Sequence, residues 1–109
     1  MKITTNEVAA RGIKFAVVEN DREVARAYLY LMHNDLHTKP FGLLEDVYVI
    51  ENKRGEGLGT KLVEQLMEEA KNQECYKLIA TSRKSRPKVH QLYKRLGFEE
   101  YGLEFRINL

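Results

Sequence analysis

The sequence predicts an α/β fold of the α+β type, with a mixed, mostly antiparallel sheet, a central β-loop-α unit and two main helices. Three observations lead to this prediction. Strand-like runs with no helix between them fill the first half of the chain. Helix and strand patterns alternate in the second half, and a cluster of glycines joins the two halves. Short connections favour antiparallel hairpins, whereas a strand, helix and strand in succession favour a right-handed parallel crossover.

The first three strands are predicted from their apolar patterns. Residues 13–18 form one apolar run, and in residues 23–33 apolar and polar side chains alternate. We expect these two runs to form an antiparallel hairpin. Turn formers in residues 34–42 predict a loop, and residues 43–50 form the third strand, whose continuous apolar end is typical of a central strand covered on both faces. One face of the second strand should carry Ala25, Ala27, Leu29 and Leu31.

Two helices and two strands are predicted in the second half. Apolar residues recur at helical spacing over about 58–73, and residues 77–82 form a short strand. A second helix should begin at Pro87, because proline suits the first turn of a helix, and should end before Gly97, a residue type common just after helix ends. A closing strand is predicted from the alternation of Phe105, Ile107 and Leu109.

Size and composition indicate a single domain over residues 1–109. The chain is 43% hydrophobic and 31% charged, which is ordinary for a soluble globular protein, and its net charge of +2 suits an anionic small ligand without requiring nucleic acid. No apolar run approaches the roughly 20 residues of a membrane span. Oligomerisation, for example as a homodimer, is a natural way for so small a domain to cover a remaining apolar face.

Cysteine usage and the amino terminus give two further expectations. Cys75 is the only cysteine and cannot form an intramolecular disulfide, and no Cys/His spacing resembles a zinc site, so we expect no metal. The first residues lack the apolar core of a signal peptide. A cytoplasmic protein is therefore expected.

The sharpest motif is three glycines at alternating positions, Gly55, Gly57 and Gly59, between a predicted strand and a predicted helix. Glycine lets the backbone turn tightly and lets a ligand approach. The free N–H groups at a helix start then form an anion site, for which phosphate is the expected occupant. A dinucleotide fingerprint would need a sixth-position glycine where Thr60 stands, and a Walker loop would need Lys61 before Thr60 rather than after it.

Two motifs together resemble a known family. The loop Arg54-Gly55-Glu56-Gly57-Leu58-Gly59 is similar to the coenzyme A loop of the GNAT superfamily of N-acetyltransferases, with its pattern Gln/Arg-x-x-Gly-x-Gly/Ala. Residues 92–98 resemble the family's second landmark, a helix that ends in Tyr-x-x-x-Gly-Phe. Both motifs stand in the family's order, with a helix and a strand between them. The resemblance covers about residue 13 to the end.

The resemblance implies a site for acetyl-coenzyme A. Main-chain groups of Val47, Tyr48 and Val49 would pair with the pantetheine arm, and Arg54 and Arg86 would add positive charge, although a solvated surface explains each arginine equally well. The pyrophosphate would be held by the N–H groups of Gly55, Glu56, Gly57, Leu58, Gly59 and Thr60.

The resemblance also implies direct transfer of the acetyl group to an amine. Tyr93 matches the family's tyrosine that protonates the departing thiolate, and a phenol with a pKa of about 10 suits that role. Its place on the apolar stripe of the second helix offers a purely structural alternative. Glu45 or Asp46 would be the general base. Adjacent strand residues point to opposite faces, so both reach one pocket only across a bulge, and we expect Glu45 to be the base.

The chain departs from the family pattern in two places. Arg86 stands where many relatives have an asparagine that bonds the cofactor, so that contact must differ. The family's first strand and helices are missing, so Tyr28, Tyr30 and residues 34–42 should define the acceptor side. The acceptor, an amine of a small molecule, peptide or protein, is not identified. The alternative function is a non-catalytic acyl-CoA sensor or interaction module, and nucleic-acid binding is the least favoured reading.

Overall fold

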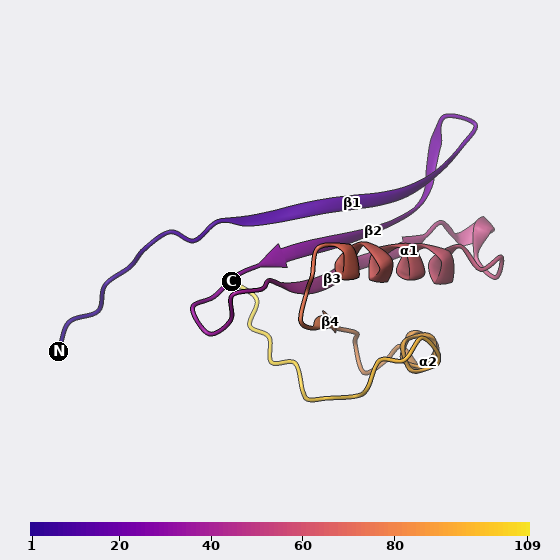
Figure 1. The fold of residues 1–109 in the computed structure, drawn as a ribbon. Coiled ribbons are helices and arrows are strands. Elements are labelled where there is room, and N and C mark those ends of the chain that lie inside the picture. The colour runs from indigo at the N-terminus through magenta and orange to yellow at the C-terminus, as the bar shows by residue number, and fades with distance from the viewer. The chain divides into compact units, whose positions relative to one another are not determined.

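The computed structural model describes residues 1–109, and the chain forms two compact units, residues 1–79 and 80–109. The mixed class predicted from the sequence is confirmed (Figure 1). The prediction of a single domain stays a prediction. The elements follow one another as β1 (Ala10–Glu19), β2 (Arg22–Met32), β3 (Phe41–Val49), a short 3₁₀ helix η1 (Glu51–Lys53), α1 (Leu58–Asn72), β4 (Leu78–Ala80) and α2 (Pro87–Arg95).

The sheet has the strand order β1-β2-β3-β4, and its first three strands are antiparallel, as predicted. The hairpin between β1 and β2 turns at Asn20 and Asp21, whose φ angles are 51° and 60°. Two central residues with positive φ are the mark of a type I′ turn, whose twist matches that of the flanking strands. Asn and Asp tolerate this conformation better than most residues, which explains why the chain reverses at this point.

A parallel step joins β3 to the segment that leads into β4. The amide of Tyr76 donates to the carbonyl of Pro40 at 3.0 Å, and the amide of Gly42 donates to the carbonyl of Lys77 at 2.9 Å. The residue numbers of the bonded partners increase in the same direction along both segments, as they do in parallel strands. Helix α1 forms the crossover between the two segments. The strand itself is shorter than the six residues expected, because only Leu78–Ala80 has strand geometry.

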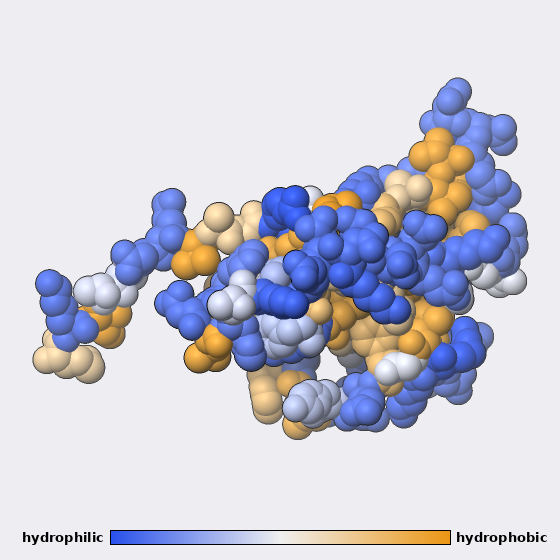
Figure 2. Space-filling model, viewed as in Figure 1, coloured by the Kyte–Doolittle hydropathy of each residue, from blue (hydrophilic) through white to orange (hydrophobic).

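The core lies between α1 and the antiparallel strands of the sheet. Leu29 of β2, Leu44 of β3 and Leu66 of α1 are almost completely buried. The predicted inward face of β2 is confirmed, since its two alanines and two leucines have at most 3% of their surface exposed. The surface over α1 in Figure 2 is largely hydrophilic, in agreement with its exposed Lys61 and Glu64.

No helix of the chain combines the length and the apolar composition that crossing a membrane would require.

The apolar end of β3 is less covered than the sequence suggested. β3 does lie inside the sheet, between β2 and β4. Its buried side chain, however, is Leu44 in its first half, whereas Val47 and Val49 are half-buried and Tyr48 is 39% exposed. The expectation of a strand covered on both faces is therefore wrong for the second half of β3.

The predicted closing strand does not form. Residues 98–109 have no strand geometry, and Phe105 and Ile107 are 89% and 80% exposed. Alternation of apolar and polar residues selects the faces of a strand, but a strand also needs a neighbour for its main-chain bonds. The local hydrogen bond from Arg106 Nε to Asn108 Oδ1, at 2.9 Å, does not supply such a neighbour.

Truncating the core residue Leu66 to alanine is expected to lower the free energy of unfolding by about 2–5 kcal/mol, because a buried leucine leaves a cavity that relaxes only in part. Urea denaturation followed by circular dichroism measures this loss. The matched control is Leu36→Ala, at a side chain that is 83% exposed, for which a change within about 0.5 kcal/mol is expected. Equal losses in the two variants would contradict the assignment of the core.

Candidate functional site

The glycine loop between η1 and α1 has a backbone that requires glycine at two positions. Gly55 and Gly57 have φ angles of 86° and 82°, in the left-handed region that side chains other than glycine rarely adopt. A Cβ atom added to either residue would meet no protein atom within 4 Å. The glycines are therefore needed for the shape of the backbone, and the space beside them is open to a ligand.

The first turn of α1 offers unpaired N–H groups beside this loop. Gly57 is the residue before the helix, and no side chain caps it. The first intrahelical bond runs from the amide of Lys61 to the carbonyl of Gly57 at 3.1 Å, so the amides of residues 58–60 have no intrahelical partner. The first turn also carries no acidic residue. Its positive dipole end is thus free to bind an anion.

Arg54 of the loop is tied back to the end of β3. Its Nε donates to the carbonyl of Val49 at 2.8 Å, and its guanidinium carbon lies 5.5 Å from the ring centroid of Tyr48. Glu56 is exposed and points its charge into solvent. The loop that carries the glycines is therefore joined by a side chain to the strand that precedes it.

A β-bulge interrupts β3 just before its exposed end. Tyr28 of β2 pairs with Glu45, and Arg26 pairs with Tyr48, so two residues of β3 face the one residue between them on β2. Asp46, one of the two, has φ 51°. Glu45 and Asp46 can point toward one pocket only across a bulge, and the structure contains a bulge at this position.

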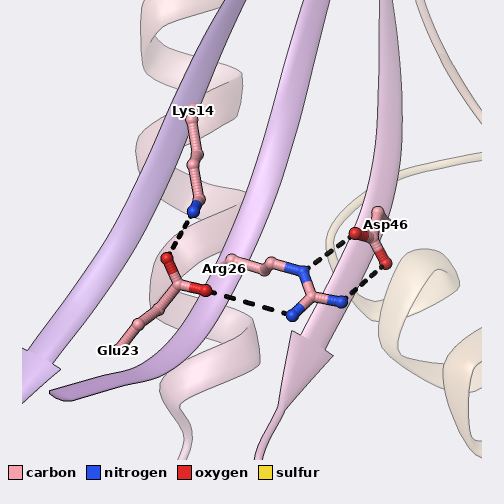
Figure 3. Close-up of polar contacts among 4 residues, drawn as sticks. All are labelled: Lys14, Glu23, Arg26 and Asp46. Carbon is pink, nitrogen blue, oxygen red and sulfur yellow. Dashed lines mark hydrogen bonds and ion pairs between the residues drawn. The ribbon is translucent and has the colours of Figure 1, made fainter.

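The two carboxylates of β3 have different surroundings. Asp46 accepts two hydrogen bonds from Arg26, at 2.8 Å from Nε and 3.4 Å from Nη2 (Figure 3). The bond to Asp46 is the main cause that raises the pKa of Arg26 above its ordinary value. Glu45 is half-buried and takes part in no ion pair or side-chain hydrogen bond. The carboxylate of Glu45 is therefore available, whereas that of Asp46 is occupied.

Glu45 shares a face of the sheet with aromatic side chains. It stands opposite Tyr28 in the register, and strand alternation places Tyr30 on the same face. The two tyrosine rings are parallel within 4°, with centroids 6.1 Å apart. Two of the expected acceptor-side residues, Tyr28 and Tyr30, thus lie on the same face of β2 and β3 as the expected base.

The main chain of residues 47–49 is paired on one edge. Val49 and Tyr48 face Ala25 and Arg26 of β2. On the other edge, the bonds that join β3 to the segment before β4 lie at the start of β3, and β4 has three residues against nine in β3. An extended ligand could therefore pair with the second edge of residues 47–49 as an added strand does.

Tyr93 belongs to a well-defined helix end in the second unit. The amide of Phe98 donates to the carbonyl of Tyr93 at 2.9 Å, the amide of Gly97 donates to that of Lys94 at 3.1 Å, and Gly97 has φ 99°. These are the two bonds of a Schellman motif. Its usual apolar contact is made by the rings of Tyr93 and Phe98, whose centroids are 5.3 Å apart. The spacing Tyr-x-x-x-Gly-Phe thus has a structural explanation of its own.

The basic loop before α2 is held by short-range bonds. The amide of Arg86 donates to the carbonyl of Arg83 at 3.1 Å, and the Nε2 of His90 is 2.8 Å from the same carbonyl. Arg86 is the residue before α2 and is exposed. His90 therefore has a structural task, and Arg86 keeps its guanidinium in solvent.

Cys75 has the surroundings of a structural residue. Its amide donates to the carbonyl of Ala70 at 3.0 Å, and burial raises the pKa of its thiol above the ordinary value. The thiol is therefore protonated at neutral pH and weakly nucleophilic.

The first unit brings together Glu45, residues 47–49 and the glycine loop, whereas Arg86 and Tyr93 lie in the second unit. Sequence reasoning missed Arg26. No local signal points to it, because its partner Asp46 lies 20 residues away and the two meet only through the register of β2 and β3.

Comparisons with known proteins give a consistent result. The profile of the Acetyltransferase (GNAT) family matches residues 4–98. The chain is 39% identical over 66 residues to probable glucosamine 6-phosphate N-acetyltransferase 2 of Oryza sativa subsp. japonica, covering 61% of this chain and 38% of that protein. It is 34% identical over 91 residues to aminoglycoside N(6')-acetyltransferase type 1 of Serratia marcescens, covering 84% and 60%.

A solved structure agrees with these relatives. The putative acetyltransferase from Agrobacterium tumefaciens str. C58 aligns with a TM-score of 0.82 and 30% identity, over 90% of this chain and 69% of that one. The chain spans less than two thirds of the length of either curated relative described above.

Proposed function

The chain belongs to the GNAT family of acetyltransferases, and from that membership we propose that it transfers an acetyl group from acetyl-coenzyme A to an amine. The observation that carries the proposal is the loop of residues 54–59, where two left-handed glycines and uncapped helix amides adjoin the bulged end of a strand. A pyrophosphate and the extended pantetheine arm that follows it in coenzyme A match these two adjacent features.

Acetyl-coenzyme A would contact both parts of this site. The N–H groups of residues 55–60 would bind the pyrophosphate, and the free edge of residues 47–49 would pair with the amides of the pantetheine arm. Arg54 would add charge beside the phosphates while its Nε holds Val49. Arg86 would meet the remaining phosphate of the cofactor as a cation, since a guanidinium donates hydrogen bonds but accepts none.

The reaction needs two proton transfers. The acceptor ammonium first gives a proton to Glu45, and the neutral nitrogen then attacks the thioester carbonyl. The negative charge that develops on the carbonyl oxygen would be stabilised by the N–H near Val49. When the C–S bond breaks, the thiolate takes a proton from the hydroxyl of Tyr93. The products are the acetylated amine and free coenzyme A.

Glu45 is the better candidate for the base because Asp46 is engaged by Arg26. Replacing Glu45 by glutamine is expected to lower kcat/KM about 100-fold at neutral pH. The loss should shrink as pH rises, since more acceptor amine is then already neutral. Steady-state rates between pH 6.5 and 9.5 measure both effects. A Glu45→Gln profile that equals the wild-type profile would contradict the role of Glu45.

The acceptor class can be narrowed by the names of relatives and by the face that carries Glu45. The two curated relatives described above are named for amino sugars, glucosamine 6-phosphate and aminoglycosides. The rings of Tyr28 and Tyr30 provide a flat surface next to Glu45. We therefore propose a small amine whose apolar side can pack on these rings. The expected homodimer and the cytoplasmic location remain predictions.

Release of free thiol from acetyl-coenzyme A tests the proposed activity. The panel contains glucosamine 6-phosphate, an aminoglycoside, spermidine and a lysine-containing peptide, with a no-acceptor control. Release that depends on an amine, and matches acetylated product by mass spectrometry, supports the enzyme. Binding of coenzyme A without transfer to any amine supports instead the alternative of a non-catalytic sensor or interaction module.

A further inference from the structure

The end of β3 has a conformation that its own sequence does not favour. Asp46 has φ 51°, in the left-handed region, and it stands at the bulge that shifts the register of the strand. An L-residue other than glycine is disfavoured in this region, even though aspartate tolerates it better than most. The bulge sets the direction of the three residues that follow, so some other contact must hold it.

Arg26 makes that contact from the neighbouring strand. Its guanidinium bonds both carboxylate oxygens of Asp46, at 2.8 and 3.4 Å, which is the two-pronged geometry that fixes direction as well as distance. Its other nitrogen lies 3.9 Å from Glu23, and Glu23 is paired with Lys14 (Figure 3). The guanidinium is therefore held on two sides, and it holds the bulge residue in turn.

The same guanidinium also packs on the residue that follows the bulge. The guanidinium carbon of Arg26 lies 4.8 Å from the ring centroid of Tyr48, and that of Arg54 lies 5.5 Å from it. Arg54 bonds the carbonyl of Val49. Side chains from β2 and from the glycine loop thus meet at Tyr48, and Arg54 also holds the carbonyl of Val49.

We propose that Arg26 is a positioning residue for the pantetheine arm of coenzyme A. Through Asp46 and Tyr48 it keeps the main chain of residues 47–49 in the orientation that the arm requires. The inference rests on the proposed function, because that function places the arm along this edge. Without Arg26 the strand end would have to be ordered when the cofactor binds, and the cost of ordering would appear as lost affinity.

Calorimetric titration with coenzyme A tests the role of Arg26. Arg26→Met keeps most of the side-chain length and removes the guanidinium. It is expected to weaken the binding of coenzyme A about tenfold, because the entropy lost on fixing roughly one backbone residue corresponds to a change in Kd of about this size. Arg11→Met is the matched control, because it removes the same charge from β1, where Arg11 bonds Gln73 at 2.6 Å. Its affinity should stay within about twofold of wild type.

A shortened ligand separates positioning from simple charge. The ligand 3′-phosphoadenosine 5′-diphosphate has the phosphates but lacks the pantetheine arm. Arg26→Met should bind it as tightly as the wild type does. If Arg26→Met loses affinity equally for both ligands, Arg26 acts as a phosphate-binding cation and the positioning role is overturned.

A second substitution tests the bulge itself. Glycine adopts positive φ without strain, so Asp46→Gly added to Arg26→Met should restore affinity for coenzyme A to within about threefold of wild type. A folded double variant that binds no better than Arg26→Met overturns the claim that Arg26 acts through the bulge at Asp46. Arg26→Lys, which keeps the charge without the two-pronged geometry, should resemble Arg26→Met. If the wild type itself binds no coenzyme A, the proposed function fails before the role of Arg26 is reached.

Discussion

Replacing Gly57 by glutamate is expected to weaken coenzyme A binding by at least about 100-fold, or ~2.7 kcal/mol. Gly57 has φ 82°, and the space beside it is empty of protein atoms. The added side chain would therefore extend into the position expected for the pyrophosphate instead of clashing with the fold. Its charge would also oppose that of the phosphates at a short distance. Calorimetric titration with coenzyme A measures the loss.

The matched control for this substitution is Gly102→Glu. A Cβ at Gly102 would also meet no atom within 4 Å, and Gly102 does not have positive φ. The substitution adds the same charge at a position outside residues 54–59. Gly102→Glu should bind coenzyme A as the wild type does. Gly57→Glu should remain folded, since strain at one left-handed residue costs only about 1–2 kcal/mol. Wild-type affinity in folded Gly57→Glu would mean that the cofactor does not occupy this loop.

Tyr93→Phe is expected to lower kcat by about 100-fold to 1,000-fold with little change in affinity for coenzyme A, because general acid catalysis contributes on this scale. Phenylalanine keeps the ring that packs against Phe98 at the end of α2. The Schellman motif, whose bonds are made by the main chain, should therefore be preserved. Pre-steady-state thiol release and equilibrium binding measure the two quantities separately.

The leaving group offers a sharper test of the same role. An acetyl donor whose thiol has a lower pKa depends less on protonation by a general acid. With such a donor, the difference in kcat between Tyr93→Phe and wild type should therefore be smaller. Tyr76→Phe is the control, since Tyr76 is 38% exposed and its ring stacks on His37. If Tyr93→Phe and Tyr76→Phe have the same kcat, Tyr93 is not the general acid, and its only role is to pack against Phe98 at the end of α2.

Local patterns predicted most of the fold. The alternation in β2 identified the face that packs against α1, and the glycine and proline positions marked both ends of α2. Such features depend on residues that are near one another in the chain. The prediction of a closing strand was wrong, because the alternation at Phe105 and Ile107 contains no information about which strand would pair with these residues.

Some parts of the site could be predicted from the sequence, and others could not. The loop of residues 54–59 could be recognised because glycine is the residue that adopts positive φ most readily, and Gly55 and Gly57 do have positive φ. The pair Arg26–Asp46 could not be recognised, since it forms only after two strands align with a bulge between them. The spacing of Tyr93, Gly97 and Phe98 was recognised, but its explanation as a helix end required the main-chain bonds.

The most direct test of the central claim, that coenzyme A lies on the glycine loop and the end of β3, is residue-resolved. Two-dimensional ¹⁵N–¹H spectra of the 109-residue chain would be recorded with increasing coenzyme A, and again with pantetheine alone. We predict that coenzyme A shifts the amides of residues 55–60 and 47–49 more than any others in residues 1–79, and that pantetheine spares the loop. Saturable binding of coenzyme A that leaves both sets of amides unshifted would contradict the account.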